Sequence, residues 1–130
     1  MNYLLDANVL IALSCPDHAD WRRSTTWING VSSFALCPIT EGALVRFLVR
    51  VGQKVPVVQA QLQAIAKHPG YEFWPNDLSY AQADLSAVTG HKQVTDAYLV
   101  ALANHHKDAK LATMDVALSL AYPNVVELIA

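Results

Sequence analysis

The amino-acid sequence predicts an α/β domain with a mostly parallel sheet. Short, largely apolar runs suited to buried strands alternate with segments whose apolar residues recur at helical spacing. Hydrophobic residues make up 53% of the 130-residue chain and charged residues 15%. This composition can fill one buried core and is unlike that of a disordered chain. We therefore expect one domain over residues 1–130, without internal repeats or linkers.

Five short runs are predicted to be strands, because each is largely apolar and bounded by polar or proline residues. They are Asn2–Leu5, Phe34–Cys37, Glu72–Trp74, Lys110–Met114 and Val125–Leu128.

The segments between these runs are predicted to be helices that begin at capping residues or prolines. Asp17, Thr40 and Thr95 are expected to cap three of them, and Pro56 to lie in the first turn of a fourth. The predicted helices span Val9–Leu13, His18–Ile28, Thr40–Arg50, the region Pro56–Ile65, Tyr80–Val88, Asp96–His106 and Asp115–Ala121.

Charge and hydropathy narrow the function classes. No apolar run approaches the ~18 residues that a membrane span needs, and the apolar N-terminus lacks a basic leader, so a cytoplasmic protein is expected. Cys15 and Cys37 are expected to be free thiols.

The net charge of −2 excludes a general polycation, yet between residues 22 and 54 of the sequence there are five basic residues and a single acid, Glu41. Such a local basic surface would suit a phosphodiester substrate, although a solvated helix face explains it equally well.

Four acidic residues are expected near the carboxyl ends of the predicted strands. Asp6 closes the first strand, and Asp115 directly follows the fourth. Glu41 and Asp96 each open a helix. Because sites in parallel sheets form outside the carboxyl ends of the strands, these acids would converge on one edge.

Each acid alone has a structural explanation, since the helix dipole favours a carboxylate in the first turn by about 0.3–1 kcal/mol and aspartate is a good helix cap. Together they are harder to explain. Two carboxylates ~4 Å apart repel by about 4 kcal/mol at an effective dielectric constant near 20. A cluster therefore needs a shared proton or a hard cation such as Mg²⁺, Mn²⁺ or Ca²⁺. A cation in such a site can assist hydrolysis of a phosphodiester.

Four motifs that contain these acids resemble, in order, those of PIN-domain nucleases, and most closely the VapC toxins of bacterial VapBC toxin–antitoxin systems. The motifs are Leu4–Leu10, Ile39–Arg46, Val94–Leu99 and Leu111–Asp115. The resemblance implies a five-stranded parallel sheet flanked by helices. It also implies Mg²⁺- or Mn²⁺-dependent cleavage of RNA, often a transfer or ribosomal RNA, inhibition by a cognate VapB-type antitoxin, and a homodimer.

The resemblance also assigns roles by motif position. It implies that Asp6 and Asp96 are the principal metal ligands, and that Glu41 and Asp115 complete an acidic catalytic pocket of four carboxylates.

Other residues are expected to support this site. Asn8 is expected to orient Asp6, and Thr113 to form a hydrogen bond within the site. Arg46 and Arg50 lie four residues apart and so share a helix face, where RNA or antitoxin contact and a surface ion pair are both open.

Three alternatives remain at this stage. A phosphohydrolase with Asp6 as nucleophile would require a second aspartate where the chain has Asn8. A PIN scaffold with weak catalysis could act mainly by binding protein or RNA. DNA is also open as substrate, because metal-assisted phosphodiester hydrolysis does not itself need a 2′-hydroxyl.

Overall fold

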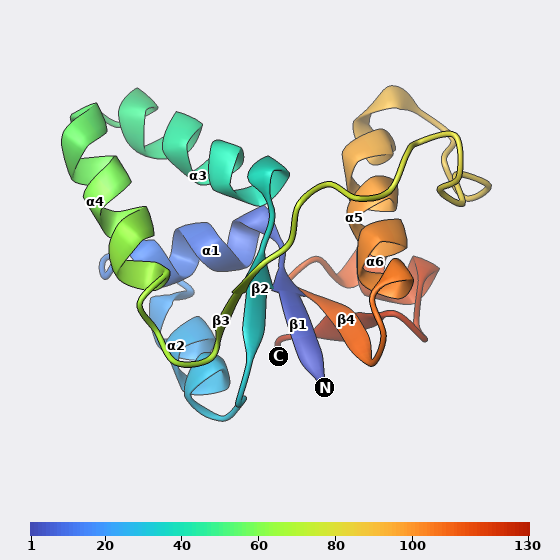
Figure 1. The fold of residues 1–130 in the computed structure, drawn as a ribbon, viewed down its shortest axis with the longest axis horizontal. Helices are drawn as coiled ribbons and strands as arrows, with labels where there is room; N and C mark the ends of the chain where they lie inside the picture. Colours follow the sequence, from blue (N-terminus) through green and yellow to red (C-terminus); the bar gives the residue numbers. More distant parts are fainter.

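Five parallel strands form the centre of the molecule, in the spatial order β3-β2-β1-β4-β5 (Figure 1). The computed structural model describes residues 1–130. The strands are β1 (Asn2–Leu5), β2 (Phe34–Leu36), β3 (Tyr71–Phe73), β4 (Ala109–Thr113) and β5 (Val126–Leu128). All four strand pairings are parallel, which confirms the predicted sheet, with boundaries that differ from the prediction by at most one residue at either end.

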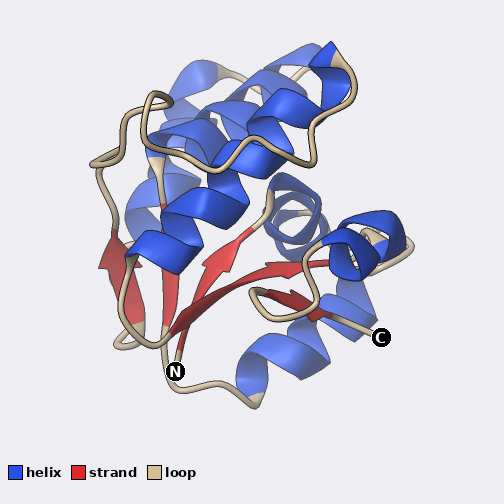
Figure 2. Cartoon of the chain, turned by 90° about the vertical axis from the view of Figure 1, so that its right-hand side faces the viewer, coloured by secondary structure: helices blue, strands red, loops and turns tan.

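Helices cover both faces of the sheet (Figures 1 and 2). One face carries α1 (Ala7–Ser14), α2 (Trp21–Asn29), α3 (Pro38–Arg50) and α4 (Val55–Ile65). The other face carries α5 (Val94–His105) and α6 (Val116–Ala121), and a 3₁₀ turn, His91–Gln93, leads directly into α5. No helix combines the length and the hydropathy that crossing a membrane would require.

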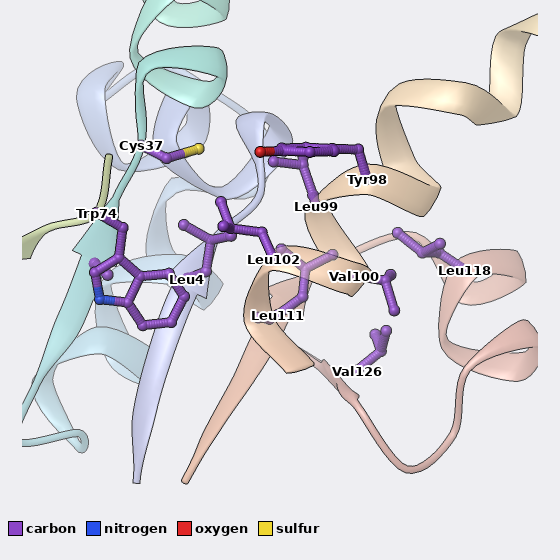
Figure 3. Packing of buried hydrophobic residues seen from close by; sticks show 12 residues of the cluster. Leu4, Cys37, Trp74, Tyr98, Leu99, Val100, Leu102, Leu111, Leu118 and Val126 are labelled. Carbon is purple, nitrogen blue, oxygen red and sulfur yellow. The ribbon is translucent and has the colours of Figure 1, made fainter. Parts of the chain in front are cut away.

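The central strand β1 is buried on both faces, so successive side chains enter different hydrophobic clusters. Leu4 packs with Trp74, Tyr98 and residues of α5 in the cluster shown in Figure 3. Leu5 packs on the opposite face with residues of α1 and α3. Both leucines are almost fully buried, and this fixes the position of the residue that follows, Asp6.

Three of the predicted helix caps are wrong. Helix α2 begins only at Trp21, since residues 15–20 form turns in which the backbone N–H of Asp20 donates to Nδ1 of His18 at 3.0 Å, so Asp17 is not its cap. Helix α3 begins at Pro38 with Cys37 as its cap. Thr40 lies in the first turn of α3, and its hydroxyl accepts a hydrogen bond from the backbone N–H of Cys37 at 3.3 Å. Helix α5 begins before Thr95, because the 3₁₀ turn continues into it.

The predicted helix Tyr80–Val88 is absent, and these residues form turns. The Asp84 carboxylate accepts hydrogen bonds from the backbone N–H and the hydroxyl of Ser86, at 3.0 and 2.6 Å. A side chain that satisfies nearby backbone donors in this way competes with helix formation.

Close packing between the segments that precede β2 and β3 leads to a stability prediction. A Cβ at Gly70 would meet the Ser32 carbonyl oxygen at 2.6 Å, whereas a Cβ at Gly42, inside α3, would meet nothing within 4 Å. We expect Gly70→Ala to lower the free energy of unfolding in urea by about 1–3 kcal/mol. The control Gly42→Ala should raise it by about 0.5–1 kcal/mol. Equal effects of the two substitutions would contradict the packing.

Candidate active site

The carboxyl ends of β1 and β4 lie side by side and bring Asp6 and Asp115 together. The two strands pair through Leu5 and Ala112, and the Asp6 N–H donates to the Ala112 carbonyl at 2.9 Å. Asp6 is the N-cap of α1, and Asp115 is the N-cap of α6, where it accepts from the Leu118 N–H at 3.1 Å. Both aspartates therefore have the capping role that their positions allow, in addition to any chemistry.

A buried threonine hydroxyl joins these segments. The Thr113 side chain is fully buried at the end of β4, and its hydroxyl donates to Oδ2 of Asp6 at 2.7 Å. The Thr113 hydroxyl oxygen also accepts hydrogen bonds from Nδ2 of Asn8 and from the backbone N–H of Asp115, both at 3.1 Å. A hydroxyl has one proton and two acceptor sites, so Thr113 uses its full hydrogen-bonding capacity here.

Asn8 acts on Asp6 through Thr113. Its Oδ1 accepts from the backbone N–H of Met114 at 3.3 Å, and this contact fixes which way the amide points. The remaining Asp6 oxygen, Oδ1, accepts from the Ala7 N–H at 2.8 Å. Both carboxylate oxygens are thus held in place, and each keeps acceptor capacity for a further ligand.

The third aspartate, Asp96, lies in the first turn of α5 and interacts electrostatically with the other two. Partial burial, followed by the charges of Asp6 and Asp115, raises the pKa of Asp96 to about 6. Burial also raises the pKa of Asp6, against the opposing effect of the hydrogen bonds from Thr113 and Ala7. Three carboxylates, two that follow β1 and β4 and one in α5, therefore repel one another at one edge of the sheet.

The fourth predicted acid, Glu41, lies on another helix. It lies in the first turn of α3, as predicted, and partial burial raises its pKa, but none of the three aspartates contributes to that shift. Burial, followed by the charge of Glu41, raises the pKa of the Tyr71 phenol. Electrostatic coupling thus links Asp6, Asp96 and Asp115, and the role of Glu41 in the same pocket stays a prediction.

No basic side chain compensates the three aspartates. The three ion pairs of the protein join the N-terminus to Asp108, Arg23 to Asp20, and His106 to Asp77. No three His, Cys, Asp or Glu side chains are arranged to hold a metal ion among themselves. Magnesium commonly uses only one or two protein carboxylates together with water and substrate phosphate, so the oxygen donors of Asp6 and Asp96 fit this ion.

A cavity of about 140 Å³ lies directly beside Asp96 and Asp115. Gln93 and Tyr122 also line it. No role in the site was predicted for either residue: Gln93 directly precedes the Val94–Leu99 motif, and Tyr122 lies outside all four motifs. Gln93 is three residues from Asp96 along the chain, whereas Tyr122, at the end of α6, comes to Asp96 only through the fold.

Arg46 and Arg50 are both exposed on α3, where they line a surface groove with Ala43 and Phe47. Neither forms an ion pair, so the predicted surface ion pair is not present. Their contact with RNA or antitoxin stays a prediction.

Comparisons with known proteins agree with this architecture. The family model described as "PIN domain" matches residues 3–122. Ribonuclease VapC29 of Mycobacterium tuberculosis (strain ATCC 25618 / H37Rv) is 45% identical over 99% of this chain and 97% of its own. Ribonuclease VapC39 of the same strain is 37% identical over 92% of each chain. A toxin–antitoxin complex from Klebsiella pneumoniae contains a chain of similar fold, with a TM-score of 0.72 and 19% identity over 98% of each chain. The chain thus belongs to the PIN domain family, and its relatives include mycobacterial VapC ribonucleases.

Proposed function

We propose that this protein is a metal-dependent endoribonuclease, the toxin component of a type II toxin–antitoxin system. The observation that carries the proposal is the set of three aspartates, Asp6, Asp96 and Asp115, which repel one another and have no basic partner. A structural role alone would not require such a grouping, because two of these aspartates could cap their helices without the third nearby.

The proposed role in hydrolysis is supported by the fixed orientation of Asp6 and by the charge of Asp96. Asp6 is held through both of its oxygens, so it presents a fixed ligand position. Above a pH of about 6, Asp96 is a carboxylate that can hold a cation or accept a proton from an attacking water. Mg²⁺ or Mn²⁺, bound by Asp6 and Asp96, would supply neutralisation of the phosphodiester charge and a water of lowered pKa.

The choice of RNA as substrate, and of an antitoxin as partner, rests on the relatives. The curated relatives are named ribonucleases of the VapC type, and the Klebsiella pneumoniae structure is described as a toxin–antitoxin complex. We extend both descriptions to this chain, with transfer or ribosomal RNA as the substrate and a VapB-type antitoxin as the inhibitor. A homodimer and a cytoplasmic location stay predictions of the motif resemblance and the sequence.

Cleavage of total RNA by the purified protein tests the proposal. We expect discrete fragments with Mg²⁺ or Mn²⁺ and none with EDTA. Asp6→Asn and Asp96→Asn should each lower the cleavage rate at least about a hundredfold, because each removes charge that acts in the transition state. Asp17→Asn changes an exposed acid outside the site and should cut like the parent.

Two outcomes would count against the proposal. Cleavage by Asp96→Asn at the parental rate would show that the site is wrongly assigned. No cleavage by folded, antitoxin-free protein, with any metal, would favour a binding-only PIN scaffold.

The hydrogen bonds of Thr113 lead to a separate prediction. Thr113→Val keeps the shape of the side chain but leaves Asp6, Asn8 and the Asp115 N–H without their shared partner. We expect the free energy of unfolding to fall by about 1–3 kcal/mol and RNA cleavage to slow at least about tenfold. Thr113→Ser retains the hydroxyl and should recover most of both. Equal behaviour of the valine and serine variants would show that the methyl group, not the hydroxyl, matters at this position.

A further inference from the structure

We propose that the cavity beside Asp96 and Asp115 binds one nucleobase of the RNA strand, next to the phosphodiester that is cut. This inference rests on the proposed function and deepens it. The cavity holds about 140 Å³ and shares Asp96 and Asp115 with the carboxylate site. Since the base and phosphate of a nucleotide are joined through one ribose, a base in this cavity would hold its phosphate close to the acids.

The lining of the cavity suits a flat, uncharged group. The small side chains of Ala97, Ala117 and Ala121 leave an open apolar floor, and six of the nine lining residues are hydrophobic. The two aspartates at its edge would repel a phosphate in the cavity itself. The neutral part of a nucleotide is therefore the part that fits here, while the phosphate is left to the cation site.

Tyr122 supplies an aromatic surface at the same place. It lies at the end of α6, is half-buried, and lines the cavity. Burial, followed by the charges of Asp84 and Asp96, raises the pKa of its phenol. Stacking of a base on an aromatic ring tolerates any base, so Tyr122 would contribute affinity rather than selectivity.

Gln93 supplies a hydrogen-bond donor of fixed orientation. Its Oε1 accepts from the backbone N–H of Thr89 at 2.7 Å and from the Thr89 hydroxyl at 3.0 Å. A backbone N–H can bond only to the oxygen of the amide, so the position of Nε2 follows, and Nε2 has no acceptor within the protein. This donor matches a carbonyl or ring-nitrogen acceptor on a base edge, which makes Gln93 a candidate for selecting the base.

Nucleotide binding can be measured independently of turnover, through the NMR signals of the alanine methyl groups. The probes are the four nucleoside 5′-monophosphates at up to roughly 10 mM with Mg²⁺. Ribose 5-phosphate is the control for binding through the sugar and phosphate alone. N-acetylarginine amide is the control for attraction of a flat cation to the two aspartates. We expect the Ala117 and Ala121 methyl signals to move saturably with at least one nucleotide and not with ribose 5-phosphate. Methyl signals that stay still with every nucleotide, or that move only with the arginine derivative, would overturn the proposal.

Filling the cavity provides the matched variants. Ala121→Leu adds bulk at an exposed position that lines the cavity, and Val116→Leu adds bulk at an exposed position of the same helix that does not. We expect Ala121→Leu to weaken nucleotide binding, and to lower kcat/KM for RNA, about tenfold or more. Val116→Leu should leave both unchanged.

Selectivity is read from fragment ends produced from RNA of randomised sequence. Gln93→Met keeps the length of the side chain but removes both the Nε2 donor and the Oε1 that accepts from Thr89, and should change the preferred base beside the cut. If the parent cuts RNA but Gln93→Met and Ala121→Leu keep its base preference, the nucleobase site is wrong and the proposed function stands. If the parent cuts nothing, the proposed function fails, and the NMR titration still decides the nucleobase site.

Discussion

Parallel pairing of β1 with β4 in the centre of the sheet is the constraint on which the site depends. The Leu5–Ala112 register places Asp6 beside Thr113, and the Thr113 hydroxyl then joins Asp6, Asn8 and the Asp115 N–H through one atom. The hydrophobic clusters on both faces hold the two strands in this register, since a shift by one residue would turn Leu4 and Leu5 each toward the other cluster. Core packing thus fixes the positions of the carboxylates and holds them close together although they repel one another.

The β1–β4 side and the α5–α6 side of the site differ in structure. The β1–β4 side is rigid, because every polar atom of Thr113 and both oxygens of Asp6 are engaged. The α5–α6 side carries Asp96 and opens into the cavity lined by Gln93 and Tyr122. In the proposed nuclease, the cation would lie between Asp6 on one side and Asp96 on the other, and the base would bind on the α5–α6 side. The cation would then support the reaction while the base contact positions the strand.

Much of this could be predicted from the sequence, because strand periodicity and the four motifs are local signals. The parallel sheet and the ends of β1 and β4 followed from apolar runs. The helix predicted at Tyr80–Val88 was wrong because the Asp84–Ser86 hydrogen bonds stabilise turns there. The cavity lined by Gln93 and Tyr122 depends on how α5 and α6 pack in three dimensions. The spacing of apolar residues along the chain does not predict how these helices pack.

Above a pH of about 6, Asp96 is held in its ionised form beside two other carboxylates, without a compensating charge. Urea unfolding of the metal-free protein and of Asp96→Asn, at pH 8 and at pH 4, tests it most directly. The raised pKa of Asp96 means that folding disfavours its charged form, a cost present above pH 6 and lost as the pH falls toward 4. Allowing for solvent screening, we predict that Asp96→Asn is more stable by about 1 kcal/mol at pH 8, with a smaller gap at pH 4. A variant no more stable than the parent at pH 8 would contradict the account.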